Sequence, residues 1–308
     1  MVFAQSVNAM SSECSLKEDG PVMDARPFMG LDRDLNCSYV DQVENLITSI
    51  QKFSESPLKV NLLVRTSYGG ASFDGGLNLE VPEQLVFEGP YGQEYGVSHY
   101  SNMTVVGHEY GHALLQDKIE KELSAKYPLV KEYSEGKKEL SKIEIELAKN
   151  PKSEALKQLL KDKTAAMINN KAFTKFFVMG GSYSELYADV VAVFNENSKG
   201  AVFNALYYDQ MSKHAFKMIH ARDFDSEFDS KYEMYMTESH GYFAHTRSFI
   251  GKNLWPSNNE EKKKYLKLIG DAIIIEMDKI MALDGDIPSF KEGNESLIKT
   301  LTVLKAKL

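Results

Sequence analysis

The stretch Val105-Val-Gly-His-Glu-Tyr-Gly-His-Ala-Leu114 predicts a local structure and a chemistry together. Its apolar residues have helical spacing, so we expect His108 and His112 to project from one helix face, one turn apart. Two imidazoles at that spacing can bind one zinc ion, with Glu109 beside the position that a water molecule takes. The pattern arises by chance in about one to two per cent of shuffled chains of this composition. The stretch therefore predicts two ligands of a catalytic zinc ion, with Glu109 as the general base.

A third protein ligand has to come from elsewhere, because a catalytic zinc ion usually has three protein ligands and one open position. The candidates are the carboxylates of Glu185-Leu-Tyr-Ala-Asp189, in an apolar segment of helical spacing that begins near Ser182. At i and i+4 they share one helix face, where burial is costly unless each is coordinated or hydrogen-bonded. We predict that Glu185 binds the metal and that Asp189 accepts the ring N–H of His108. The alternative is an ordinary helix with one carboxylate near its start and the other in solvent.

Together the two motifs resemble those of the gluzincin zinc metallopeptidases, the group that includes thermolysin. The ending Glu185-x-x-Ala-Asp189 is similar to that of the membrane-associated and periplasmic zinc proteases related to the CaaX prenyl protease. The resemblance implies a zincin-like fold with one catalytic Zn²⁺ ion. Two features depart from it: 72 residues separate His112 from Glu185, more than in thermolysin, and the membrane span of the CaaX-type proteases is missing. A long insertion is tolerable, because the entropy of closing a surface loop rises slowly with its length.

The segment Ala71–Val81 resembles the edge strand that these peptidases place above the zinc ion, against which a substrate lies extended. The resemblance assigns substrate binding along this strand to Ser72, Phe73, Gly75 and Gly76. It covers residues 71–114 and 182–194, and no other part of the chain carries it.

A tetrahedral oxyanion usually needs a hydrogen-bond donor in addition to zinc. In the gluzincins this donor is a downstream His, Tyr or Arg, and here such residues are concentrated in Glu238–Arg247. We predict His245 as the donor, followed by Tyr242, with His240 and Arg247 as further candidates. The alternative is that these side chains only pack at the start of a helix. The remaining histidines, at positions 99, 214 and 220, show no ligand spacing.

The hydrophobic period changes along the chain and predicts an α+β fold. Alternation predicts strands at Leu58–Arg65 and Gly76–Val81, joined through glycine-rich turns. Spacings of three and four predict helices at Asp41–Phe53, from Asn102 onward, from Ser182, and at Ala201–Ile219, Phe243–Lys252, Glu260–Leu283 and Ser296–Leu308. The predicted units are an irregular N-terminal arm (1–40), a lobe with a small mixed sheet and the active-site helix (41–125), an inserted, charged helical hairpin (126–172) and a helical lobe with the third zinc ligand (173–308).

Composition excludes several classes of function. The 308 residues are 43% hydrophobic and 26% charged, a globular profile, and the net charge is −8. A chain without a basic surface is poorly suited to bind nucleic acid or an anionic membrane. No run approaches the roughly 18 apolar residues that a membrane-spanning helix requires, so we expect no integral span.

The two cysteines, Cys14 and Cys37, both lie in the N-terminal arm and suggest a disulfide, with two unpaired thiols as the alternative. A disulfide indicates an oxidising compartment. The start of the chain has small residues at Ala4 and Ala9 and no charge before Glu13, as in the trimmed end of a secretory signal. We therefore expect export to the periplasm or the medium, with the cytoplasm as the alternative.

These features predict a zinc-dependent peptidase that acts on a peptide or protein through a metal-activated water and Glu109. One alternative is a catalytically latent binding or chaperone-like module that uses the charged hairpin. An intact Glu109 argues against it, since a binding site does not need a general base. The other alternative is a zinc hydrolase of a non-peptide ester, amide or epoxide.

Overall fold

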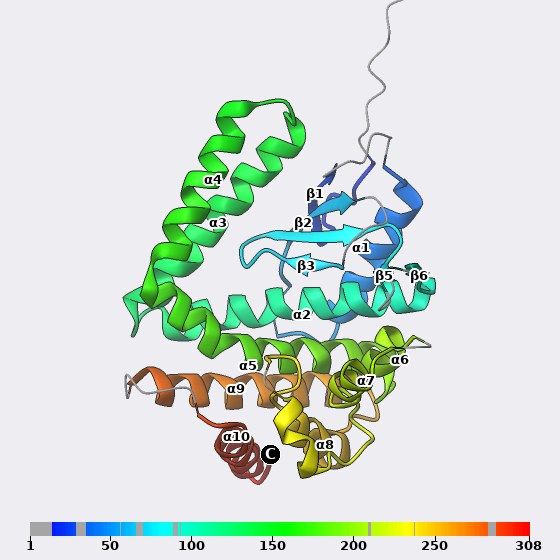
Figure 1. Ribbon diagram of the computed structural model, residues 1–308, viewed down its shortest axis with the longest axis vertical. Coiled ribbons are helices and arrows are strands. Elements are labelled where there is room, and N and C mark those ends of the chain that lie inside the picture. The colour runs from blue at the N-terminus through cyan, green and yellow to red at the C-terminus, as the bar shows by residue number, and fades with distance from the viewer. Residues whose placement is uncertain are drawn as a thin grey trace, which may run out of the picture.

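A small sheet lies above two long helices, and further helices form the layers below them (Figure 1). The structure is a computed structural model that describes residues 14–28, 35–55, 57–65, 70–88, 92, 94–208, 211–236, 238–282 and 288–308. The proposed remnant of a secretory signal, at residues 1–9, lies outside them. The predicted fold class is confirmed at the level of an α+β protein with a small mixed sheet and a mostly helical body.

The main sheet has four strands in the order β1-β2-β4-β3. β1 (Val22–Pro27), β2 (Val60–Arg65) and β4 (Asn78–Pro82) are parallel, and β3 (Ser72–Phe73) pairs antiparallel with β4 at the edge. β2 is apolar apart from Asn61 and its last residue, Arg65, and is buried along most of its length, as expected of a central parallel strand. A separate antiparallel pair consists of β5 (Val86–Glu88) and β6 (Glu94–Gly96).

The expectation of an irregular arm over residues 1–40 is wrong for its described part, because β1 lies there. Only Val22 and Ala25 of this strand are buried, and charged residues interrupt its alternation. β1 is a strand because it pairs with β2. This pairing does not require apolar and polar residues to alternate in the sequence of β1. The first helix, α1 (Cys37–Gln51), also begins before Asp41, because Asn36 caps it.

The two central helices are α2 (His99–Leu123) and α5 (Lys171–Glu196). They approach closely at Gly111, where an added Cβ would lie 2.6 Å from the Cα of Ala188. Only glycine fits at this crossing. α5 begins eleven residues before the expected Ser182, because Gly180 and Gly181 lie inside the helix and do not end it.

The C-terminal part is helical, with boundaries that differ from those expected. The predicted helix Ala201–Ile219 is two helices, α6 (Ala201–Leu206) and α7 (Lys213–His220). The elements that follow are η1 (Ser230–Tyr235), α8 (Ala244–Asn253), α9 (Asn259–Ala282) and α10 (Phe290–Lys305). α10 begins before the predicted Ser296, at a capping box formed by Ser289 and Glu292.

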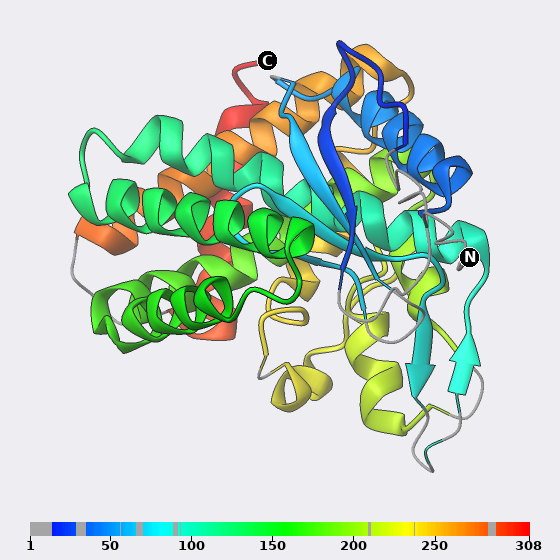
Figure 2. The same ribbon diagram turned by 90° about the horizontal axis from the view of Figure 1, so that it is seen from above.

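The charged segment forms two antiparallel helices, α3 (Pro128–Lys149) and α4 (Glu154–Asn169), which stand to one side of the sheet in both views (Figures 1 and 2). α4 buries none of its residues, whereas α3 packs against the sheet through contacts such as that of Ile145 with Leu63. One face of α3 is therefore joined to the body of the protein, and α4 is its solvated partner.

One hydrophobic core joins the sheet to the helices that precede and follow the hairpin in the sequence. It includes Ile47 of α1, Leu62 of β2, Leu115 of α2, Val190 of α5 and Ile269 of α9. Each of these side chains is fully buried. Within the described residues, no helix combines the length and the hydropathy needed to cross a bilayer.

The two cysteines are joined in a disulfide, which ties the segment before β1 to the first residue of α1. The pairing predicted from their position is thus present. Since the bond closes a loop over a separation of 23 residues, it restricts the unfolded chain.

Replacing both cysteines, Cys14→Ser with Cys37→Ser, is expected to lower the free energy of unfolding by about 3 kcal/mol, the entropy of closing a loop of this length. Urea denaturation of the oxidised proteins measures the change. The wild type unfolded in reductant is the control, and it should lose the same amount. Equal midpoints for all three samples would contradict the prediction.

Candidate metal centre

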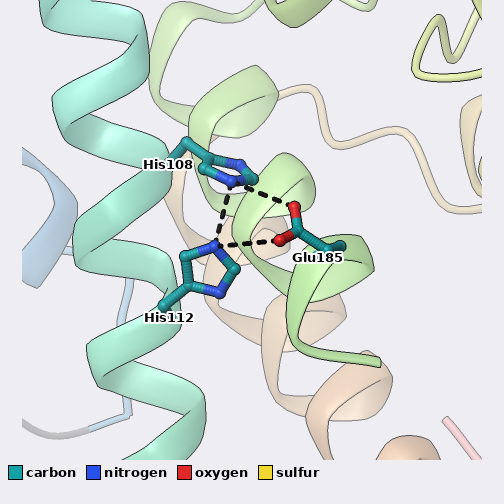
Figure 3. Close-up of side chains that lie close together, drawn as sticks. All are labelled: His108, His112 and Glu185. Carbon is teal, nitrogen blue, oxygen red and sulfur yellow. Dashed lines mark hydrogen bonds and ion pairs between the residues drawn. The ribbon is translucent and has the colours of Figure 1, made fainter. Parts of the chain in front are cut away.

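Three side chains converge between the central helices: His108 and His112 from α2, and Glu185 from α5 (Figure 3). Their candidate ligand atoms all lie within 4.8 Å of one another. The two Nε2 atoms are 3.0 Å apart, His108 Nε2 is 3.3 Å from Glu185 Oε2, and His112 Nε2 is 3.7 Å from Glu185 Oε1. Among the described residues this is the one His, Cys, Asp and Glu group arranged to hold a metal ion.

The two helices reach this arrangement through local features of their sequences. The i, i+4 spacing places both imidazoles on the face of α2 that meets α5. Gly111, next to His112, then lets the backbone of α5 approach at Ala188, less than one turn after Glu185. The side chains of all three predicted ligands are at most 15% exposed, so the cluster is largely shielded from water.

Each histidine has a partner on the ring nitrogen that faces away from the cluster. Nδ1 of His108 lies 2.9 Å from Oδ1 of Asp189, the contact expected from the sequence. Nδ1 of His112 lies 2.7 Å from Oγ of Ser184, a contact that was not predicted from the sequence. Both partners lie on α5, beside Glu185 or one turn from it. They fix the orientation of the rings, leaving each Nε2 to face the common centre.

The charge states of the two histidines differ. Burial and the neighbouring His108 lower the pKa of His112 to about 3, so its lone pair is available to a cation. For His108, burial and Arg222 also oppose the charge, but hydrogen bonds to Asp189 and Glu185 outweigh them and raise the pKa to about 9. A metal ion bound at Nε2 would take the place of that proton.

Asp189 is fully buried between two arginines. Arg222 donates to it from Nε, at 3.1 Å to Oδ2, and from Nη2, at 2.5 Å to Oδ1. Arg247 donates from Nε to Oδ2 at 2.8 Å. Although burial favours the neutral acid, the two guanidinium groups hold the pKa of Asp189 well below its usual range. The carboxylate beside His108 therefore stays charged.

Arg222 was not predicted from the sequence, and Arg247 has a different role from the predicted one. Arg247 was a candidate oxyanion donor, but its side chain is fully buried against Asp189. The chain has five arginines among 36 basic residues, so two of them on one buried carboxylate is notable. That scarcity is the one signal in the sequence that could have drawn attention to them, since neither has motif spacing to the ligands.

Glu109 lies beside the cluster without being part of it, with Oε2 3.9 Å from His112 Nε2. Its Oε2 accepts a hydrogen bond of 3.0 Å from the backbone N–H of Phe73, on β3. Burial, with the nearby charge of Glu185, raises the pKa of Glu109 to about 7. The edge strand thus contacts the predicted general base directly.

The four residues expected to bind substrate on the edge strand fall into two pairs. Ser72 and Phe73 form β3, beside α2. Gly75 and Gly76 lie in the turn between β3 and β4 and face α3: the space at Gly75 is bounded by Lys137, and that at Gly76 by Ser141. The turn therefore contacts the hairpin, which the resemblance did not imply.

The predicted oxyanion donors are distributed differently from the expectation. His245 packs against Phe228 and Phe290, and its Nε2 lies 3.8 Å from Glu233. Tyr242 donates to the carbonyls of Pro288 and Ser289. Neither is brought to the cluster, because His245, on α8, faces η1 and α10, and Tyr242, just before α8, faces the start of α10. His240 is the residue of this segment that reaches the site, with Nε2 3.4 Å from Glu185 Oε1 and Nδ1 3.3 Å from Glu238.

A pocket of about 170 Å³ adjoins the cluster. Four of its lining residues, His108, Glu109, Arg222 and His240, belong to the site or touch it. The others come from the segment before β3, from the stretch between β4 and β5, from α2 and from α6: Gly70, Ala71, Leu85, Thr104, Val105, Val202, Ala205 and Leu206. The pocket is therefore mainly apolar, with charged groups at the end nearest the candidate ligands.

A comparison of the chain with protein families, curated proteins and solved structures finds no match to any of them.

Proposed function

We propose that the protein is a zinc-dependent peptidase of the gluzincin type, with a zincin-like fold, in which Glu109 is the general base. The observation that carries the proposal is the position of Glu109. It lies beside a His-His-Glu cluster and is bonded to the backbone of the edge strand on which a substrate would lie.

Two observations support zinc as the metal. Two imidazoles and one carboxylate are a donor set of catalytic zinc sites, and tetrahedral ligands about 2.0–2.1 Å from zinc lie about 3.3 Å from one another. The separations of 3.0, 3.3 and 3.7 Å bracket that value. In addition, Glu185 Oε2 is buried, and two groups within 4 Å of it are cationic or can become so: His108 Nε2 at 3.3 Å and Arg222 Nη2 at 3.7 Å, an environment that favours a charged carboxylate able to bind a cation.

Zinc bound by His108, His112 and Glu185 would polarise the scissile carbonyl and lower the pKa of a bound water to about 7. Glu109 would serve as the general base for the attacking water and as the proton donor to the leaving amine. The N–H of Phe73 holds the Glu109 carboxylate in position for both transfers. Asp189 and Ser184 keep the two imidazoles oriented throughout.

The surroundings support a peptide as the substrate. β3 is an edge strand, so an extended peptide can add to it by backbone hydrogen bonds. The adjoining pocket can take one apolar side chain of the peptide. His240, held by Glu238, lies closest to the cluster among the candidates for donating to the oxyanion, ahead of His245 and Tyr242. The disulfide supports export to an oxidising compartment.

The proposal is tested by comparing Glu185→Gln with the wild type. Zinc affinity is expected to fall more than about 100-fold, because replacing a residue that only hydrogen-bonds to a metal ligand already lowers metal affinity 10- to 100-fold. Competition with a chromophoric chelator measures the affinity, and cleavage of a quenched unstructured protein measures the activity. Glu196→Gln is the matched control on the same helix, away from the cluster.

One tight zinc ion and proteolysis in the wild type, both lost in Glu185→Gln and kept in Glu196→Gln, are the expected results. A wild type that binds no zinc would overturn the proposal. Zinc binding with hydrolysis of small esters or amides, but not of peptides, would replace it with the non-peptide hydrolase. Zinc binding without any hydrolysis would favour the latent binding module.

A further inference from the structure

The helical hairpin is hydrogen-bonded to the turn that leads out of the edge strand. Oγ of Ser141, on α3, donates to Asp74 Oδ2 at 2.5 Å and accepts from the N–H of Leu77 at 2.9 Å. Nζ of Lys137 donates to the carbonyl of Asp74 at 2.9 Å. One fully buried hydroxyl of the hairpin therefore bonds to both sides of the turn.

These contacts of Ser141 and Lys137 with the turn, called the junction below, extend into β4 through Asn78, which is also fully buried. Its Nδ2 donates to the carbonyl of Ser141 and to Oε2 of Glu144, each at 3.0 Å. Its Oδ1 accepts from Asn61 of β2 at 2.9 Å. The bonds thus run without a break from the hairpin to the centre of the sheet.

The backbone of the turn is packed closely against α3. A Cβ at Gly76 would overlap the Ser141 hydroxyl and the Lys137 carbonyl, so the backbone of the turn lies directly on α3. Gly75 has φ +84°, in the left-handed region that favours glycine. Asp74 Oδ1 closes the turn by accepting from the N–H groups of Gly76 and Asn78.

The turn is connected to the candidate site by one residue. Phe73 precedes Asp74, and its N–H is the donor to Glu109. The position of this donor is set from one side by pairing with β4 and from the other by the bonds of Asp74 to α3. β3 has only two residues, so its pairing alone is a weak constraint.

We propose that the hairpin positions the substrate-binding edge strand, with Ser141 and Asp74 as positioning residues that act through Phe73 on Glu109. The role of the strand rests on the proposed peptidase function. The positioning itself rests on the contacts of the junction.

The charges at the junction indicate that the contact between α3 and the turn depends on pH. Three carboxylates meet there, those of Asp74, Glu80 and Glu144, with Arg65 on Glu80 and Lys137 on the carbonyl of Asp74. Burial, with the charge of Asp74, raises the pKa of Glu144 to about 8. Ionisation of Glu144 as the pH rises adds repulsion between α3 and the turn.

The test compares Ser141→Ala with Ser134→Ala. Ser134 is a buried serine of the same helix, and its hydroxyl accepts a bond from Gln116 of α2, away from the turn. Hydrogen exchange of peptides that span residues 71–79 is measured by mass spectrometry on the intact protein. Zinc content, and kcat and KM on an unstructured protein substrate, are measured on the same samples.

We expect Ser141→Ala to speed exchange in residues 71–79 by about tenfold or more, since buried hydrogen bonds are lost. We also expect it to raise KM and lower kcat with unchanged zinc content. Ser134→Ala should do none of this. Unchanged exchange, or equal exchange in both variants, would overturn the inference whether or not the protein is a peptidase. A fast-exchanging strand in a protein that cleaves no substrate would support the positioning and refute the proposed function alone.

Discussion

Glu109→Gln is expected to lower kcat for peptide cleavage by about 10²- to 10⁴-fold, the range typical of a general base. The amide cannot accept the proton of the attacking water, but it keeps an oxygen to accept the N–H of Phe73. The strand and the three candidate ligands should therefore stay in place. Steady-state kinetics with a quenched protein substrate measures the effect, and elemental analysis confirms equal zinc content.

Glu122→Gln is the matched control, because Glu122 is an exposed residue near the end of the same helix. It should leave kcat unchanged. Full activity in Glu109→Gln would show that another group acts as the base. Loss of zinc together with activity would show that Glu109 helps to hold the metal, which its separation from the cluster does not suggest.

Asp189→Asn is expected to lower the free energy of unfolding by about 3–5 kcal/mol, the cost of removing one partner from a buried ion pair. The substitution keeps the shape of the side chain and removes the charge that Arg222 and Arg247 share in the interior. Arg247 then loses its ion-pair partner, and Arg222 keeps only the longer contact with Glu185, at 3.7 Å. Urea denaturation followed by circular dichroism measures the change, on metal-free samples so that zinc binding does not contribute.

Asp278→Asn provides the comparison. Asp278 pairs with Lys126 on the surface, where the two side chains are 35% and 56% exposed, and such pairs are worth about 0–1 kcal/mol. Equal losses in the two variants would contradict the importance of the buried network. If Asp189→Asn fails to fold, Arg222→Met combined with it should restore part of the stability, since one of the unpaired charges is then removed.

The parts of the site that the sequence predicted are those that lie on one helix. His108 and His112, and likewise Glu185 and Asp189, are one turn apart, so the helical period alone places each pair on a common face. That the two pairs meet depends on the packing of α2 on α5. The only sign of this packing in the sequence is Gly111, and a glycine in a helix can be there for other structural reasons.

The parts that could not be predicted depend on tertiary contacts between segments without a shared period. Arg222 approaches Asp189 from a loop after α7, and Ser141 approaches Asp74 across 67 residues. His240 rather than His245 faces the site because of the path of a loop. Two other elements show the same limit. β1 forms by pairing with β2 although its alternation is weak, and α5 continues through two glycines because it is packed in the core.

The hairpin also bears on the rate at which the protein folds. Contacts between residues far apart in sequence slow folding, and 72 residues separate His112 from Glu185. Yet α3 and α4 are neighbours that pair locally, so they can form before α2 meets α5. Once they have formed, the stretch left to close between the two metal-binding helices is short, and its entropy cost falls accordingly. We therefore expect that loosening the hairpin would slow refolding more than it speeds unfolding.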